Sequence, residues 1–217
     1  MAKAKQSKEP PSERGLMIDT VIFDIGNVLI DFDWDGYMNS LFKDDIIIEK
    51  VNAAIWEDGR WAEFDRGVLS DQEIISRMVA HGEGVESEIR QTIDRVGECV
   101  RQKETTLPWI RSLHAAGLQV LYLSNYSEML MQKGPEALSF LPEMDGGVFS
   151  CHVKVLKPDP AIYQAICEKY HLLPERCVFL DDLPENVDGA VRYGMQGIRF
   201  RGYEEAKALL DRMIMEG

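Results

Sequence analysis

The chain has 217 residues, of which 45% are hydrophobic and 28% charged, and its formal net charge is −13. These proportions are typical of a globular protein with one domain or two unequal ones. An acidic surface repels phosphate backbones, which disfavours nucleic acid as a partner. No apolar run approaches the roughly eighteen residues of a membrane span. We therefore expect a soluble, cytoplasmic protein with neither nucleic acid nor a membrane as partner.

The first residues contain lysines but no apolar stretch behind them, so they are not expected to be a signal peptide. We predict a disordered tail over residues 1–15. Four cysteines, Cys99, Cys151, Cys167 and Cys177, include no CxxC pair. This pattern favours a reducing compartment over a disulfide framework.

The first apolar segment, LMIDTVIF, predicts a buried strand that ends at Asp24. From about Asp33 to Thr106 the pattern is helical, with a further helix expected from about Ser87 to Val100. Inside this region the SDQE sequence that starts at Ser70 is typical of a capping box at a helix start.

Strands and helices alternate in the second half of the chain. Strands are predicted at LQVLYL, VFS, CVFL and GIRF, and helices at about 128–133, 160–170, 185–193 and 204–215. Such alternation indicates a parallel sheet with helices on both faces. We predict an α/β fold, a Rossmann-like sheet in a core over 16–32 and 107–217. A small all-helical cap over 33–106 is inserted after the first strand.

Polar residues follow the predicted strands, and open parallel sheets bind ligands beyond the carboxyl ends of their strands. Asp24 follows the first strand, Ser124 and Asn125 the second, and Asp181 and Asp182 the fourth. Carboxylates gathered at one edge repel one another unless a cation joins them. Carboxylate oxygens with open water positions suit Mg²⁺.

A lysine, Lys157, precedes a predicted helix in the sequence KPDP. A hydroxyl, backbone amides and a lysine beside a metal form a phosphate site. An ionised carboxylate can attack phosphorus there and form an acyl phosphate. The metal and Lys157 would stabilise the charge on the phosphoryl oxygens.

The segments FDIGNV, LSN, KPDP and FLDD, in this order, resemble the four motifs of the haloacid dehalogenase superfamily. The resemblance extends from about Met17 onward, and the helical insert is similar to that superfamily's small cap. FDIGNVLIDFD resembles the branch that keeps FDLGNV and includes the bacterial α-D-glucose-1-phosphate phosphatase. The resemblance implies a Mg²⁺-dependent phosphatase that hydrolyses a small phosphorylated metabolite, with a sugar phosphate expected, through an aspartyl-phosphate.

The resemblance also implies roles for individual residues. Asp24 would be the nucleophile, and Ser124 and backbone amides near Asn125 would bind the phosphoryl group. Lys157 would neutralise the negative charge of the nucleophile and of the phosphate. The cap segment WAEFDRGVLSDQE resembles a turn that faces the active site in the superfamily. Its side chains, Arg66 among them, are expected to contact the substrate, although a solvated loop explains the same residues equally well.

For the metal, the resemblance implies a shell made by the Asp24 carboxylate, the Gly26 carbonyl and Asp182. Asp181 would hold the lysine or a metal-bound water, and Asn186 would support the site from behind.

One position departs from the superfamily's pattern. Its phosphatases usually carry a second aspartate two residues after the nucleophile, where it acts as general acid and base; this chain has Gly26. Asp31, Asp33 or a metal-bound water are candidate replacements. The glycine leaves two alternatives open: a metal-independent 2-haloacid dehalogenase that uses Asp24, and a non-catalytic module that binds sugar phosphates. The sequence predicts no oligomeric state.

Overall fold

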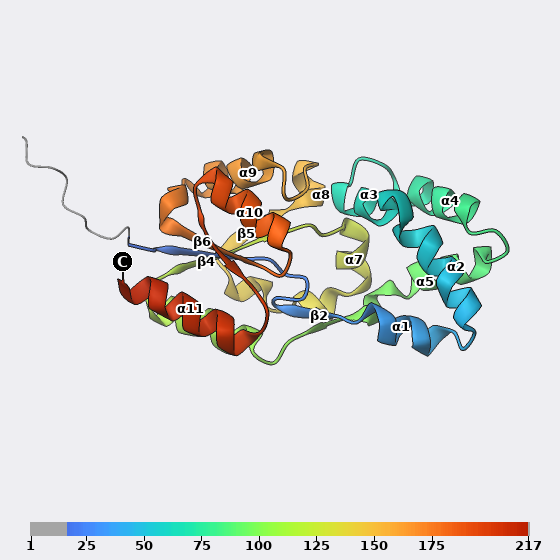
Figure 1. The fold of residues 1–217 in the computed structure, drawn as a ribbon, viewed down its shortest axis with the longest axis horizontal. Helices are drawn as coiled ribbons and strands as arrows, with labels where there is room; N and C mark the ends of the chain where they lie inside the picture. The colour runs from blue at the N-terminus through green and yellow to red at the C-terminus, as the bar shows by residue number, and fades with distance from the viewer. Residues whose placement is uncertain (1–16, 217) are drawn as a thin grey trace, which may run out of the picture.

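The computed structural model describes residues 17–216, so the predicted tail over 1–15 lies outside the described residues. Two parts lie next to each other along the long axis of the molecule, an α/β core and a helical cap (Figure 1). The predicted fold class is confirmed. No helix within residues 17–216 is long and apolar enough to cross a membrane.

The core is built on a parallel sheet of five strands in the order β5-β4-β1-β6-β7. The strands are β1 (Thr20–Phe23), β4 (Gln119–Ser124), β5 (Gly146–Phe149), β6 (Cys177–Asp181) and β7 (Gln196–Arg199). The central strand β1 is buried along its whole length, as its apolar TVIF sequence predicts. Phe23 aligns with Leu180 of β6 and Tyr122 of β4, so the residues that follow these strands meet at one edge.

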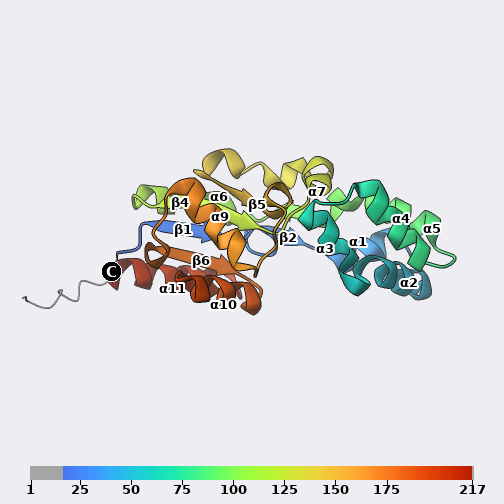
Figure 2. The same ribbon diagram turned by 90° about the horizontal axis from the view of Figure 1, so that it is seen from above.

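Helices cover both faces of the sheet (Figure 2). They are α6 (Thr106–Ala115) and α11 (Tyr203–Glu216) on one face, and α9 (Pro160–Tyr170) and α10 (Pro184–Tyr193) on the other. Alternate side chains of a strand point to opposite faces. Accordingly, Phe23 packs in the same cluster as Trp109 of α6, whereas Ile22 packs in the cluster that contains Ile162 of α9.

The cap follows β1 and consists of short helices. They are α1 (Trp34–Leu41), α2 (Asp45–Trp56), α3 (Arg60–Arg66), α4 (Asp71–His81) and α5 (Glu86–Asp94). The capping box predicted at Ser70 is present: its hydroxyl and the Glu73 carboxylate each accept from the other residue's amide. The helix predicted to reach Val100 is wrong beyond Asp94, because a 3₁₀ turn forms over residues 96–99.

A two-stranded antiparallel ribbon connects the core to the cap. It pairs β2 (Ile30–Phe32) with β3 (Val100–Gln102), on either side of the inserted helices. The prediction of a purely helical segment is therefore wrong at β3. Three residues are too few to show an alternating pattern, and β3 is specified by a partner about 70 residues away.

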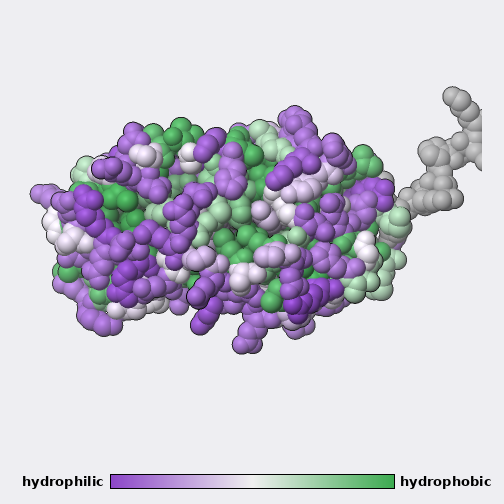
Figure 3. Space-filling view, turned by 180° about the vertical axis from the view of Figure 1, so that it is seen from behind, coloured by the Kyte–Doolittle hydropathy of each residue, from purple (hydrophilic) through white to green (hydrophobic). Residues whose placement is uncertain are grey.

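Hydrophilic residues cover most of one face of both parts, and hydrophobic ones gather near the middle of that face, between core and cap (Figure 3). Aromatic rings pack where the ribbon enters the cap: Phe32 and Trp34 stack with ring centroids 6.1 Å apart, and Trp34 contacts Trp56 edge-on at 5.0 Å. This packing couples the ribbon to the cap.

Two short helices complete the frame of the site. They are α7 (Glu128–Lys133), which follows β4, and α8 (Ser150–Val153), which follows β5. Helix α8 contacts α3 of the cap. The carboxyl edge of the sheet therefore faces the cap.

Candidate functional site

Asp24 occupies the first position after the central strand β1. Its Oδ1 accepts a hydrogen bond from the Ile25 amide at 2.7 Å and lies 2.8 Å from Lys157 Nζ. The pKa of Asp24 is raised to about 7, because burial and the Asp181 charge raise it more than Lys157 and Ser124 lower it. A nearby cation would favour the ionised carboxylate that nucleophilic attack requires.

Lys157 joins two carboxylates at the edge of the sheet. Its side chain is only 1% exposed, and its Nζ lies 2.6 Å from Asp181 Oδ2 as well as 2.8 Å from Asp24. Burial alone would lower the pKa of Lys157, but the two carboxylates outweigh it and the net shift is upward. The lysine therefore remains charged in the site.

Asp181 is fully buried at the end of β6 and uses most of its lone pairs on protein donors. Besides Lys157, the Asn186 amide donates to both of its oxygens at 3.1 Å, and the Leu183 backbone amide donates to Oδ1 at 2.9 Å. A carboxylate with four such contacts orients its partners and has little capacity left for a metal ion.

Asn125 fixes the segment that carries the lysine. Its Oδ1 accepts from the Lys157 amide at 2.8 Å, and its Nδ2 donates to the Lys157 carbonyl at 3.1 Å. Both polar atoms of the Asn125 side chain thus bind the Lys157 backbone. Its backbone amide remains as the group that can bind a ligand. Ser124 is buried at the end of β4, close enough to Asp24 to lower the pKa of that carboxyl.

Asp24 and Asp182 could hold a divalent cation, with Asp181 next to them. One carboxylate oxygen from each of Asp24, Asp181 and Asp182 lies within 4.8 Å of the others. Burial raises the pKa of Asp182, which is half-buried and less committed to protein donors than Asp181. Three carboxylates lie near one lysine, so the site has excess negative charge, and the carboxylate oxygens of Asp24 and Asp182 are donors that fit Mg²⁺.

Asn27 was not singled out from the sequence. Its Nδ2 donates to Asp182 Oδ2 at 3.1 Å, and it adopts the left-handed conformation with φ of 56°. Asparagine tolerates the left-handed conformation better than most residues. The Gly-Asn pair directly after a strand is therefore the sequence signal that could have identified Asn27.

The predicted substrate contact from the cap, Arg66, lies in the last turn of α3. Its Nε is 3.4 Å from Glu63 Oε1, and both side chains are partly exposed. Gly26 lies beside the nucleophile, with an isolated bridge to Ile30.

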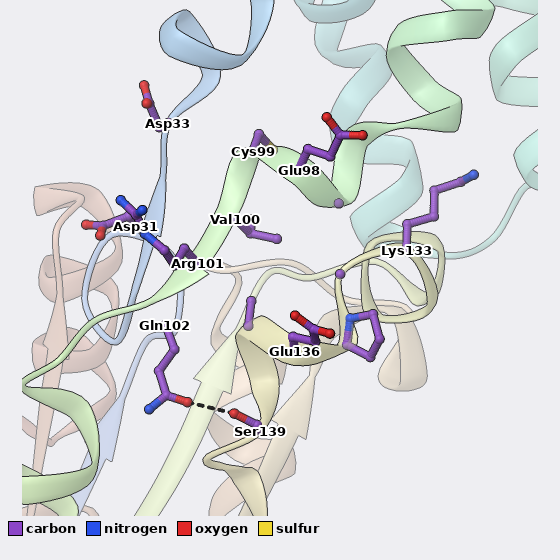
Figure 4. A pocket seen from close by; sticks show the side chains of 14 residues that line it. Asp31, Asp33, Glu98, Cys99, Val100, Arg101, Gln102, Lys133, Glu136 and Ser139 are labelled. Atoms are coloured by element: carbon purple, nitrogen blue, oxygen red, sulfur yellow. Dashed lines mark hydrogen bonds between the residues drawn. The ribbon is translucent and has the colours of Figure 1, made fainter. Parts of the chain in front are cut away.

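The two aspartates considered as replacement acids, Asp31 and Asp33, line a different hollow, between β3 and the turn after α7 (Figure 4). Asp31 lies on the ribbon and forms an ion pair with Lys103. Asp33 caps α1, where its carboxylate accepts from the Gly36 amide at 3.0 Å. Both carboxylates therefore have structural partners away from Asp24.

A family model described as haloacid dehalogenase-like hydrolase matches residues 18–194, and the chain belongs to this family. It is therefore an enzyme of the hydrolase class. Flavin mononucleotide hydrolase 1 of Arabidopsis thaliana is 25% identical over 159 residues, which are 70% of this chain and 61% of that protein. Against three of its curated relatives, the chain spans between 19% and 61% of their length.

Solved structures share the fold. A haloacid dehalogenase family enzyme of Bacteroides thetaiotaomicron, in complex with magnesium and inorganic phosphate, superposes with a TM-score of 0.71 at 19% identity, covering 88% of this chain and 98% of that one. The L-2-haloacid dehalogenase of Xanthobacter autotrophicus superposes with a TM-score of 0.61 at 20% identity, covering 91% and 84%.

Proposed function

We propose that this hydrolase is a Mg²⁺-dependent phosphomonoesterase in which Asp24 attacks phosphorus. The observation that carries the proposal is the buried Lys157, which joins the Asp24 and Asp181 carboxylates at 2.8 and 2.6 Å. This arrangement supplies a nucleophile and a fixed positive charge at one place. A bound Mg²⁺, held by Asp24, the Gly26 carbonyl and Asp182, would supply further charge stabilisation for the phosphoryl oxygens.

The chain's own residues account for the first chemical step. Asp24 Oδ forms a bond to phosphorus as the ester P–O bond breaks, which gives an aspartyl-phosphate. Lys157 and the Ser124 hydroxyl bind the phosphoryl oxygens, with backbone amides near Asn125. Asp181 and Asn186 hold the lysine in place, because a displaced ammonium would no longer face the transition state.

We further propose that the substrate is a small phosphorylated metabolite, with a sugar phosphate as the specific expectation. The FDIGNV motif supports the sugar phosphate through its resemblance to the glucose-1-phosphate phosphatase branch. The cap, taken as residues 33–106, would close over the core at 16–32 and 107–217 and exclude water during transfer. Arg66 is the proposed contact to the sugar.

All four cysteines are buried free thiols, which supports a reducing compartment such as the cytoplasm. The acidic net charge of −13 supports a small ligand over a nucleic acid.

The proposal is tested by phosphate release from a panel of sugar phosphates, nucleotides and small phosphorylated acids with Mg²⁺ present. We expect Asp24→Asn to lose turnover of every ester that the wild type hydrolyses, because an amide is a poor nucleophile. A matched control is Asp19→Asn, which removes a partly exposed carboxylate that pairs with Arg176 at the opposite end of β1. Wild-type activity in Asp24→Asn would refute the assignment.

EDTA separates phosphatase from dehalogenase chemistry, since attack on carbon by the same aspartate needs no metal. Three adjacent carboxylates favour the metal-dependent reaction. Metal-independent halide release from 2-haloacids, without phosphate release from the panel, would establish the alternative. Tight binding of sugar phosphates with no phosphate release would establish a non-catalytic module.

A further inference from the structure

The site described so far contains no general acid beside the nucleophile. Gly26 has no side chain, and a Cβ built on it would meet no atom within 4 Å. The space at Gly26 is therefore open, and Asp31 and Asp33 have partners elsewhere. A side chain that gives the leaving alcohol its proton must therefore lie on another element.

The cap brings one aspartate, Asp65, to this edge of the sheet. Its carbonyl accepts a hydrogen bond from Ser150 Oγ at 2.6 Å, and Ser150 Oγ itself accepts from the Tyr126 amide at 3.0 Å. Lys154 Nζ donates to the Gly67 carbonyl just after α3. The end of α3 is thus anchored to the segments that follow β4 and β5.

The backbone of the cap approaches the backbone of the core closely at Gly67. Gly67 has φ of +64°, and a Cβ there would lie 2.9 Å from the Cys151 carbonyl oxygen. A side chain at this position would therefore push the cap away from the core. The glycine keeps Asp65 close to the catalytic edge.

The Asp65 carboxyl is buried close enough to Asp24 and Lys157 for both charges to affect it. Its pKa is raised to about 7, because burial and the Asp24 charge raise it more than the Lys157 charge lowers it. Asp65 nevertheless keeps part of its surface accessible. A proton donor must be largely buried, accessible to the substrate and close to the reacting groups. The Asp65 carboxyl, which the Asp24 and Lys157 charges both affect, has this environment.

A free hydrogen-bonding group lies nearby. The Tyr126 hydroxyl is buried without a hydrogen-bond partner, and Asp65 is among the groups that raise the pKa of Tyr126, after burial and Cys99. A buried hydroxyl of this kind can orient a neighbouring carboxyl or a water molecule.

We propose that Asp65 of the cap is the general acid and base of this enzyme, in the role that Gly26 leaves vacant. The inference rests on the proposed phosphatase function. As Asp24 bonds to phosphorus, the Asp65 proton passes to the leaving oxygen and an alcohol departs. Water then attacks the aspartyl-phosphate and gives a proton to Asp65, the bond between phosphorus and the Asp24 oxygen breaks, and phosphate leaves. Both carboxyl groups return to their starting states.

The test compares two esters in the full chain with Mg²⁺ present. Phenyl phosphate needs its leaving oxygen protonated, whereas p-nitrophenyl phosphate does not. We expect Asp65→Asn to lower kcat on phenyl phosphate by about 100-fold or more. On p-nitrophenyl phosphate it should release about one equivalent of nitrophenol per enzyme in a burst, followed by slow turnover, because the base for the second step is missing.

Two further variants test whether Asp65→Asn loses activity only because it disturbs the structure. Glu86→Gln changes an exposed carboxylate of the cap that pairs with Arg90 on α5, outside the segment expected to face the substrate, and we expect its kcat on both esters to stay within about twofold of wild type. Adding Gly26→Asp to Asp65→Asn places a carboxyl two residues after Asp24, at a position with room for a side chain. Recovery of phenyl phosphate turnover would show that the missing function is proton transfer.

An unchanged kcat of Asp65→Asn on phenyl phosphate would overturn the inference, as would an equal loss on both esters without a burst. A wild type that hydrolyses neither ester nor any member of the phosphate panel would instead refute the proposed function itself. The two failures are therefore distinguishable.

Discussion

Among residues 17–216, Lys157 is the one charged residue within hydrogen-bonding distance of both buried carboxylates of the site, Asp24 and Asp181. Replacing it by methionine removes that charge. The lysine side chain is 1% exposed, and the Asp24 and Asp181 side chains are 11% and 0% exposed. Removing one partner of a buried ion pair costs about 3–5 kcal/mol, because the remaining charge is left without compensation. We expect Lys157→Met to lower the free energy of unfolding by this amount at pH 8.

The loss of unfolding free energy in Lys157→Met should increase with pH. Burial already raises the pKa of Asp24 to about 7, and without the lysine it rises further. Protonation relieves the unpaired charge, so the difference between variant and wild type should shrink at pH 5 and be largest at pH 8. Urea unfolding in EDTA, with the slope m compared between the proteins, measures both values.

A matched control is Lys207→Met on α11, which breaks a partly exposed pair with Asp211. Exposed pairs contribute little, and we expect a change within about 0.5 kcal/mol. If Lys157→Met were as stable as wild type at pH 8, the buried carboxylates would not depend on the lysine, and the electrostatic account of the site would be wrong.

Three other measurements probe the cap, its contact with the core and the raised pKa of Asp24. Ser70→Ala removes the capping box of α4 and should cost about 1 kcal/mol in urea unfolding. Gly97→Ala would place a Cβ 1.9 Å from the Lys133 carbonyl oxygen, so we expect a loss of about 1–3 kcal/mol, whereas Gly26→Ala meets no atom and should be neutral in EDTA. Because the Asp24 pKa is raised, its contribution to stability is complete below pH 3.8 and is lost as pH rises through about 7; metal-free Asp24→Asn should therefore show a flatter stability profile from pH 4 to 8.

The sequence by itself predicted the core well. Strands at TVIF, LQVLYL and CVFL are buried apolar runs between helices, and their composition is enough to identify them. The side chains after these strands could also be predicted as neighbours, because parallel strands present their carboxyl ends at one edge. Asp24, Asp181 and Asp182 do meet there.

Tertiary structure decided the features that depend on partners distant in sequence. The ribbon of β2 and β3 forms only because Ile30–Phe32 and Val100–Gln102 pair across the whole cap, and neither segment has a pattern of its own. The division of tasks between Asp181 and Asp182 likewise depends on how many donors each meets, which two adjacent aspartates in a sequence cannot reveal.

The cap shows the same division. Its helices follow from apolar periodicity and capping residues, which are local properties. The position of the Asp65 backbone next to the segment after β5 depends on the hydrogen bond between Ser150 and the Asp65 carbonyl, groups 85 residues apart. Local sequence thus determined which elements form and which residues end them, whereas long-range hydrogen bonds and close backbone contacts decided which of the polar side chains share one site.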